Sequence, residues 1–211
     1  DQRSANTQHN AAFKAVFDGQ PFAATPAANQ AGDLGKAVAG SDAFSLALNL
    51  SNLTFKNLVA LHFEPKAGTL VDSWKSGKQS KHVTTYDAAY ALVALQIFQR
   101  AQDALPVGYA AGDNGDLNLA TAQGKQALEL ITKQADFLLG QLKGKNGLLY
   151  DGITLGGKHD AGQSIDTQLA AVRGLTAAFL ATHDAKYRSA ARELFIATDK
   201  AYFNQKAGTW T

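Results

Sequence analysis

A short phrase that occurs three times along the chain constrains the fold more than any other feature. Lys66–Asp72 reads KAGTLVD, Lys145–Asp151 reads KNGLLYD, and Lys206–Trp210 reads KAGTW. When the first phrase is placed on the second, Gly68 falls on Gly147, a shift of 79 residues. A recurrence at this spacing indicates that one supersecondary unit is used more than once.

The match continues beyond the phrase at the same shift and without gaps. Asp72 falls on Asp151, and Asp87 falls on Asp166, so fourteen residues separate the two aspartates in both copies. The apolar residues that follow also keep register, Ala91 with Ala170 and Val93 with Val172. We therefore interpret the repeat as structural.

Apolar residues recur at spacings of three and four, which is typical of amphipathic helices, whereas strand-like alternation is hard to find. The ranges expected to be helical are 4–17, 41–63, 84–104, 119–142, 164–182 and 186–203. The apolar stripe of the helix over 84–104 consists of Tyr86, Tyr90, Val93 and Ile97. The sequence thus predicts an all-α fold of repeated helical hairpins.

Residues 1–40 are predicted to form an N-terminal helix and a loop rich in alanine, glycine and proline, followed by a hairpin-repeat domain over 41–211. Its units cover about 50–103 and 129–182, with a truncated third from about 186. In each unit the glycine follows a helix end, where a left-handed backbone favours glycine. The chain ends inside the third unit, so we expect a longer protein or a second chain to complete the array.

Composition excludes several classes of protein. The net charge of the 211 residues is +2, and no basic run of the kind that binds nucleic acid is present. No segment approaches the roughly 20 apolar residues of a membrane span. The absence of cysteine removes disulfides, thiol catalysis and cysteine metal sites. The chain begins at Asp1 without a methionine, from which we expect a processed, secreted, periplasmic or cell-surface protein.

The stretch DTQLAAVRGLTAAFLATHDAKYRSAARELF (Asp166–Phe195) resembles a hairpin of the six-hairpin, (α/α)6-toroid superfamily. The matching positions of its turn and outer helix are Thr182, Asp184, Tyr187, Ala191 and Leu194. The resemblance covers about Ser41 to Thr211 and implies part of an (α/α) toroid-like array. A closed toroid needs twelve helices, whereas this chain offers about half of them.

The superfamily includes glycoside hydrolases, sugar epimerases and polysaccharide lyases, whose sites lie at the N-termini of the inner helices and in the preceding loops. Carried over by position, the resemblance implies Asp87 and Asp166 as candidate catalytic residues. The implied substrate-binding residues are Asp72, Trp74, His82, Tyr86, Asp151 and His159, in loops that also contain Lys81, Lys158 and Asp160. No cofactor and no metal site are expected.

Each candidate also has a structural interpretation. Two carboxylates at about 5–10 Å can cleave a glycosidic bond, but aspartate in a first helical turn also interacts with unpaired backbone N–H groups and the helix dipole. Trp74 could stack on a sugar or cover the hairpin core. His82 and His159 lack any metal-binding spacing, and we expect exposed loop histidines.

Two functions stay open. The first is an extracytoplasmic carbohydrate-active or carbohydrate-binding domain, similar to glycoside hydrolases, with polysaccharide as its partner. The second is a non-catalytic structural or interaction module of the cell envelope, completed by another protein chain. An enzyme requires Asp87 or Asp166 in a concave site with a raised pKa, whereas a module requires carboxylates bonded to nearby backbone groups.

Overall fold

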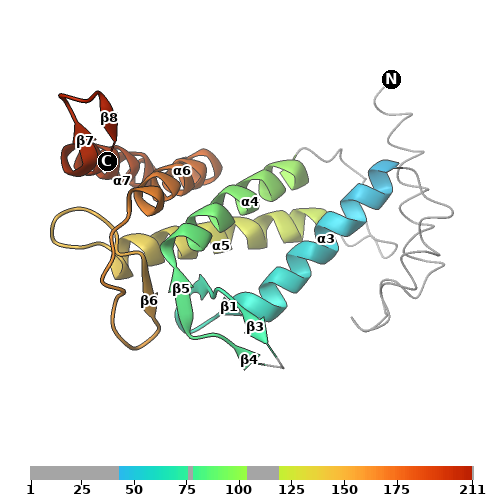
Figure 1. The fold of residues 1–211 in the computed structure, drawn as a ribbon. Helices are drawn as coiled ribbons and strands as arrows, with labels where there is room; N and C mark the ends of the chain where they lie inside the picture. Colours follow the sequence, from blue (N-terminus) through green and yellow to red (C-terminus); the bar gives the residue numbers. More distant parts are fainter. Residues whose placement is uncertain (1–42, 76–77, 104–118, 211) are drawn as a thin grey trace, which may run out of the picture. The chain divides into compact units, whose positions relative to one another are not determined.

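The computed structural model describes residues 43–75, 78–103 and 119–210, which form five helices joined by short strands (Figure 1). The helices are α3 (Ala43–His62), α4 (Thr85–Asp103), α5 (Leu119–Gln141), α6 (Ile165–Thr182) and α7 (Ala185–Tyr202). All five begin and end within two residues of the predicted ranges. The predicted helix over 4–17 and the rest of segment 1–40 lie outside the described residues.

The chain divides into two compact units, residues 1–56 with 101–123 and residues 57–100 with 124–211. In the first unit, Gln102 Nε2 donates a buried hydrogen bond of 2.9 Å to Asn52 Oδ1. The second unit contains α6, α7, most of α4 and α5, and all of the predicted site residues.

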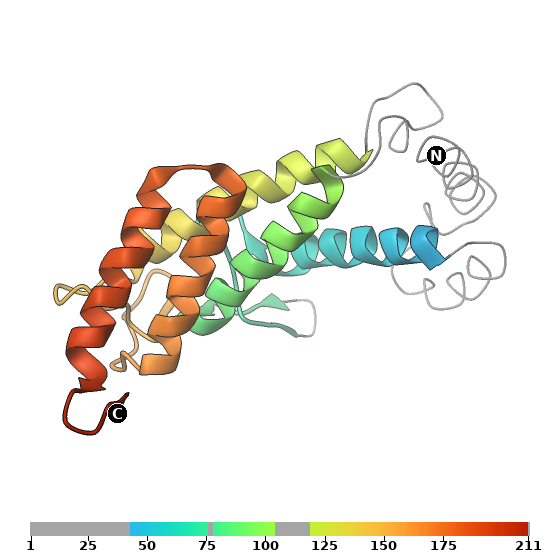
Figure 2. The ribbon, with the colours of Figure 1, turned by 90° about the horizontal axis from the view of Figure 1, so that it is seen from above.

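The hairpin of α6 and α7 shows how local sequence produces the fold. His183 ends α6 in a left-handed conformation (φ 56°), and its N–H donates to the Phe179 carbonyl. Asp184 then caps α7 by accepting a hydrogen bond from Lys186 N at 2.9 Å. The two helices consequently run side by side in opposite directions (Figure 2).

Neighbouring hairpins pack through small residues and one buried tyrosine. A Cβ atom at Gly174 of α6 would lie 2.7 Å from the Ala89 carbonyl oxygen of α4, so the two inner helices are in close backbone contact. Between the outer helices, the Tyr187 hydroxyl of α7 donates to Asp136 Oδ1 of α5 at 3.0 Å. The sequence repeat therefore corresponds to a spatial array of helical hairpins.

Eight short strands, which the sequence did not predict, shape the loops. They are β1 (Phe63–Glu64), β2 (Thr69–Leu70), β3 (Trp74–Lys75), β4 (Lys78–Gln79), β5 (His82–Thr84), β6 (Gly152–Thr154), β7 (Phe203–Asn204) and β8 (Thr209–Trp210). Each has two or three residues, too few for alternation to be visible. All pairs are antiparallel: β1 with β2, β3 with β4, β5 with β6, and β7 with β8.

The glycine phrases form three turns, which we call turn 1 (63–70), turn 2 (143–149) and turn 3 (203–210). Gly68, Gly147 and Gly208 all have positive φ, at 69°, 86° and 66°. Turns 1 and 3 share the same strand register, with Phe63 opposite Leu70 and Phe203 opposite Trp210. Turn 2 is one residue shorter, because Tyr150 N bonds to Leu142 O whereas Val71 N bonds to His62 O. At the end of α5, the structural equivalent of His62 is therefore Leu142, one residue away from the position that the gapless alignment gives.

Candidate functional site

The first aspartate of each repeat holds the start of the following inner helix. Asp72 Oδ1 accepts a hydrogen bond of 2.6 Å from Thr84 N, and Asp151 Oδ1 accepts one of 2.7 Å from Ser164 N. Asp151 also accepts from the Ser164 hydroxyl at 2.9 Å. The repeated aspartates thus occupy equivalent anchoring positions, and the structure gives both a role in loop geometry.

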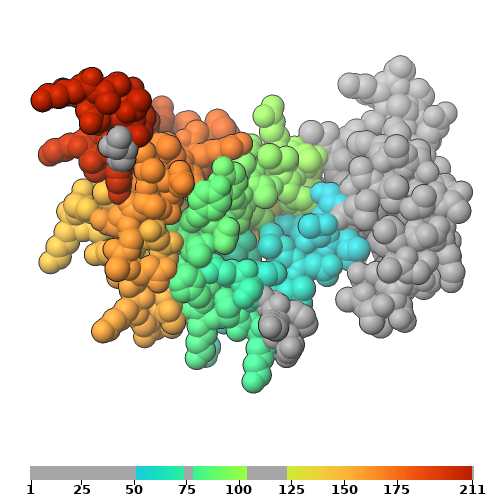
Figure 3. Space-filling model, in the orientation of Figure 1, coloured from blue at the N-terminus to red at the C-terminus, as the bar shows by residue number. Residues whose placement is uncertain are grey.

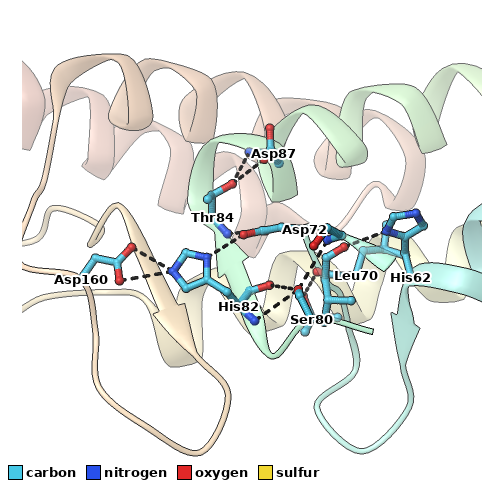
Figure 4. A network of polar contacts seen from close by, with 11 residues as sticks. His62, Leu70, Asp72, Ser80, His82, Thr84, Asp87 and Asp160 are labelled. Carbon is cyan, nitrogen blue, oxygen red and sulfur yellow. Dashed lines mark hydrogen bonds and ion pairs between the residues drawn. The ribbon is translucent and has the colours of Figure 1, made fainter. Parts of the chain in front are cut away.

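The side chain of His82 lies between two carboxylates from successive repeats (Figure 4). His82 Nδ1 is 2.6 Å from Asp72 Oδ2, and His82 Nε2 is 3.1 Å from Asp160 Oδ2. The pairing of β5 with β6 brings the two loops together, since His82 lies opposite Thr154. His82 is therefore only partly exposed, and the expectation of an exposed loop histidine is wrong for this residue.

Ionised carboxylate oxygens only accept hydrogen bonds, so the position of both ring nitrogens of His82 against carboxylates favours the protonated imidazolium, in which both nitrogens donate. The hydrogen bond to Asp72 raises the pKa of His82 above its usual value of 6.5, burial partly opposes this, and Asp160 adds a smaller upward effect. The protonated ring joins the loop of the first repeat to the loop of the second.

We expect the bridge to make stability depend on pH. Because the folded-state pKa of His82 is raised above 6.5, its stabilisation is complete below about pH 6.5 and is lost as the pH rises through the folded pKa. Melting curves between pH 5.5 and 9 should therefore show a decline for the wild type that His82→Gln lacks. His183→Gln, at an exposed helix end, is the matched control and should retain the decline. Equal profiles for wild type and His82→Gln would contradict the bridge.

Asp87 participates in a helix cap. Asp87 Oδ2 accepts a hydrogen bond of 2.8 Å from the Thr84 hydroxyl. The backbone N–H of Asp87 donates to the oxygen of this hydroxyl, Thr84 Oγ1, at 3.3 Å. Thr84 thus caps the first turn of α4 through its side-chain oxygen. The second bond of a capping box is missing, because the backbone N–H of Thr84 donates to Asp72 and not to Asp87. Asp166 is exposed in the first turn of α6, the equivalent position of the second repeat. The structural interpretation of Asp87 thus has direct support.

Two tyrosines and an arginine form an exposed cluster beside these carboxylates. The rings of Tyr86 and Tyr90 lie 4.8 Å apart, and the Arg173 guanidinium of α6 lies 5.6 Å from the Tyr90 ring centre. Hydrogen bonding with Tyr90 raises the pKa of Tyr86, and the charges of Asp166 and Asp87 add to this effect.

The predicted apolar stripe of α4 is only partly the buried face of this helix. Tyr86, Tyr90 and Ile97 are exposed and Val93 is half-buried, whereas Ala89, Leu92 and Leu95 are fully buried. The apolar stripe is thus wrong as a guide to the core at both tyrosines, while Tyr86 keeps the substrate-binding role that the resemblance implies as a prediction. In the sequence, Tyr86 and Tyr90 are four residues apart, and Asp87 of the first turn directly follows Tyr86. Residues four apart lie on the same side of a helix, so the two tyrosines are neighbours near the start of α4.

The remaining candidates have separate positions. Trp74 lies in β3, and its side chain is outside the described part of the structure. His159 is exposed as predicted; its ring stacks on Tyr150 at 4.4 Å, and its Nε2 donates to the Gln141 carbonyl at 2.5 Å. His159 therefore holds its loop against the end of α5.

A shallow hollow of about 750 Å³ lies elsewhere in this unit. Its lining includes Glu64, Gln79, Lys81, Phe137 and Leu155, and none of the predicted site residues. Within the described residues, no group of three or more acidic or histidine side chains is suited to hold a metal ion. No helix in the described ranges is long and apolar enough to cross a membrane.

Comparison with solved structures relates this geometry to a known fold. The crystal structure of D-mannose isomerase, an (α/α)6 toroid, matches with a TM-score of 0.52 and 18% sequence identity, over 90% of this chain and 41% of that protein. The chain thus shares an array of helical hairpins with part of that structure and spans less than half the length of that isomerase. No protein-family model matches the sequence, and no curated protein matches it.

Proposed function

We propose that the exposed face of α4 and α6 binds a carbohydrate, as part of a carbohydrate-binding, toroid-like protein. The observation that carries this proposal is the pair of exposed tyrosines, Tyr86 and Tyr90, with Arg173 over one ring. Exposed aromatic faces suit the apolar faces of sugar rings, while a guanidinium and carboxylates suit their hydroxyls. The fold similarity to a sugar isomerase is consistent with this ligand class.

The finer hypothesis is glycoside hydrolysis with Asp87 and Asp166 as the acid and the nucleophile or base. In its favour, both carboxylates are exposed in the first turns of α4 and α6, two helices in close backbone contact. The capping bond between Thr84 and Asp87 favours the alternative, a non-catalytic module in which these aspartates only terminate helices.

Titration calorimetry with a panel of soluble oligosaccharides tests binding. We expect the double variant Tyr86→Ala, Tyr90→Ala to weaken binding at least tenfold, about 1.4 kcal/mol, because it removes both stacking faces. Ile97→Ala, at another exposed position of α4, is the matched control and should bind normally. Unchanged affinity in the double variant would overturn the proposal.

Product analysis with the same panel separates catalysis from binding. If the aspartates are catalytic, Asp87→Asn and Asp166→Asn should each abolish cleavage while ligand still binds. Asp199→Asn, on the exposed surface of α7, serves as the control for loss of one charge. Absence of cleavage by the wild type on every ligand that binds would favour the non-catalytic module.

A further inference from the structure

Two successive repeats build the hollow of about 750 Å³ in the second unit. Turn 1 supplies Glu64 and Lys66, and the segment that joins β4 to β5 supplies Ser80 and Lys81. The second repeat supplies residues near the end of α5 and residues of β6 and the loop after it. The lining residues lie between positions 64 and 156, so neither end of the sequence forms one of the walls.

Hydrogen bonds within and between the two repeats hold these walls in place. β5 pairs with β6, and Leu155 N donates to Lys81 O at 2.7 Å. In the first repeat, Gln79 Nε2 donates to Phe63 O at 3.1 Å, which ties β4 to turn 1. Figure 3 shows the green residues of the first repeat against the orange residues of the second. The hollow is therefore largely preformed, as ligand sites usually are.

Part of the lining is apolar. Phe137 of α5 and Ile153 of β6 are buried residues that line the hollow, and Ala67 and Leu155 are half-buried. The volume lies within the range of roughly 300–1,000 Å³ that is usual for small-molecule sites. Among the described lining residues Phe137 is the single aromatic one, so the hollow offers no exposed ring on which a nucleobase would stack.

Two lysines at the hollow have no counter-ion. Lys66 and Lys81 both line it and are exposed, and neither forms an ion pair within residues 43–75, 78–103 and 119–210. By contrast, Lys186 of α7 pairs with Asp136 at 2.9 Å. An anionic group in the hollow would therefore have two ammonium groups available for charge-assisted hydrogen bonds.

The other polar groups suit hydroxyls rather than further negative charge. Glu64 lines the hollow, and its Oε1 accepts a hydrogen bond of 3.1 Å from Lys66 N. An ionised carboxylate repels a highly charged polyanion but accepts hydrogen bonds from hydroxyls. The side-chain amides of Gln79 and Gln141 can both donate and accept. The lining thus combines cations for one anionic group with partners for neutral hydroxyls.

We infer that this hollow binds an acidic sugar, a single hexose-sized ring that carries one carboxylate or phosphate group. Lys66 and Lys81 pair with the anionic group, while Glu64 and the glutamine amides bond to the ring hydroxyls. The apolar part of the lining packs against the C–H groups of the ring. We call the site the lysine hollow, and we define it by Glu64, Lys66, Gln79, Lys81 and Gln141.

The lysine hollow is separate from the tyrosine cluster of the carbohydrate proposal. It shares no residue with Tyr86, Tyr90 and Arg173. The inference therefore goes beyond that proposal, and different variants test the two. If both are right, the second unit has two sugar sites, one of which requires a negative charge on its ligand.

NMR titration of the full 211-residue chain tests the inference with three hexoses that differ only at carbon 6. They are glucose, glucuronate and glucose 6-phosphate. We expect at least one of the acidic sugars to bind at least tenfold more tightly than glucose, because only they bring a negative charge to the two lysines. The backbone amide signals of Ala67, Ser80 and Leu155 should shift on binding. The comparison of the two acidic sugars identifies the anionic group.

Variants of the lining locate the anionic group. Lys66→Gln and Lys81→Gln should each weaken binding of the acidic sugar by about fivefold, near the upper end for an exposed ion pair. The double variant should bind the acidic sugar no better than glucose. Lys125→Gln, at an exposed position of α5, is the matched control and should change nothing.

Acetate and inorganic phosphate are the ligand controls. Both should bind at least tenfold more weakly than the corresponding acidic sugar, because they lack the ring and its hydroxyls. If either anion binds as tightly as the sugar, the hollow holds an anion without recognising a sugar, and the inference is wrong.

Three further outcomes would overturn the inference. The first is absence of binding by both acidic sugars, and the second is equal affinity for all three hexoses. The third is binding of an acidic sugar that Tyr86→Ala with Tyr90→Ala abolishes and Lys66→Gln with Lys81→Gln leaves unchanged. That last result would support the carbohydrate proposal and remove the lysine hollow, so the two can fail separately.

Discussion

Replacing Gly174 with valine is expected to lower the free energy of unfolding by about 3 kcal/mol, at the upper end of the cost of overpacking. A Cβ atom at this position would lie 2.7 Å from the Ala89 carbonyl oxygen and 2.9 Å from Ala89 Cα. Both atoms belong to the backbone of α4, so no side-chain rotation can relieve the contact. The two inner helices must move apart instead.

The matched control is an exposed glycine in the last turn of α5. A Cβ atom at Gly140 of α5 would meet no described atom within 4 Å. Gly140→Ala should therefore stabilise the protein by about 0.5–1 kcal/mol, the usual gain from replacing glycine by alanine in a helix. The same replacement at Gly174 should destabilise it, because the contact with Ala89 outweighs this gain.

Thermal or urea unfolding measures both effects, with about 2–4 °C in Tm for each kcal/mol in a chain of this length. Opposite signs for Gly174→Ala and Gly140→Ala support the close packing of α4 on α6. If both variants stabilise the protein, the inner helices are not in backbone contact, and the toroid-like arrangement of the hairpins is wrong at this point.

The helices could be predicted from the sequence because each is long enough to show its period. The predicted start at residue 164 and end at 182 agree closely with α6, Ile165–Thr182. The turn of the hairpin was recognisable through the resemblance, whose matching positions include Asp184, which caps α7, and Tyr187, which is buried. These features depend on residues within one or two helical turns.

Features that depend on distant segments could not be predicted. The contact between His82 and Asp160 joins residues 78 positions apart, and it requires β5 to pair with β6. Two strands of three residues give no periodic signal. The sequence correctly placed both residues in loops before inner helices, but nothing in it indicated that the imidazole faces two carboxylates.

The dependence on distant segments also explains why the apolar stripe wrongly predicts a buried Tyr90. A stripe of apolar residues predicts one buried face per helix, but an inner helix of a hairpin array has neighbours on several sides. Here Ala89 faces α6 closely, while Tyr90 lies exposed under Arg173. The small residues, rather than the large ones, identify the tightest contact.

Tyr187→Ala is expected to destabilise the protein by about 3–5 kcal/mol, the usual cost of removing a buried aromatic side chain. The ring of Tyr187 is fully buried in α7. Its hydroxyl lies 3.0 Å from Asp136 Oδ1 and 3.3 Å from Thr132 O, both on α5. The substitution thus removes apolar contacts and the hydrogen bonds that join two successive outer helices.

Tyr187→Phe separates the ring from the hydroxyl. We expect a loss of about 1–2 kcal/mol, near the lower end for hydrogen bonds to charged groups, because Asp136 is half exposed and keeps its ion pair with Lys186 at 2.9 Å. Burial, with help from Asp136, raises the pKa of Tyr187 to about 12. The neutral phenol therefore contributes stability that is complete below about pH 10 and is lost between about pH 10 and 12.

Unfolding curves at pH 7 and between pH 9.5 and 12 provide the measurement. Tyr187→Phe should be less stable than the wild type at neutral pH. Its free energy of unfolding should decline less than that of the wild type as the pH rises to 12. Tyr202→Phe controls for phenol ionisation elsewhere on α7. A decline in Tyr187→Phe as steep as in the wild type would mean that this hydroxyl is not the group that ionises. A cost for Tyr187→Ala below about 1 kcal/mol would mean that α7 does not dock on α5 through this residue, and the array of hairpins would lose its principal side-chain link.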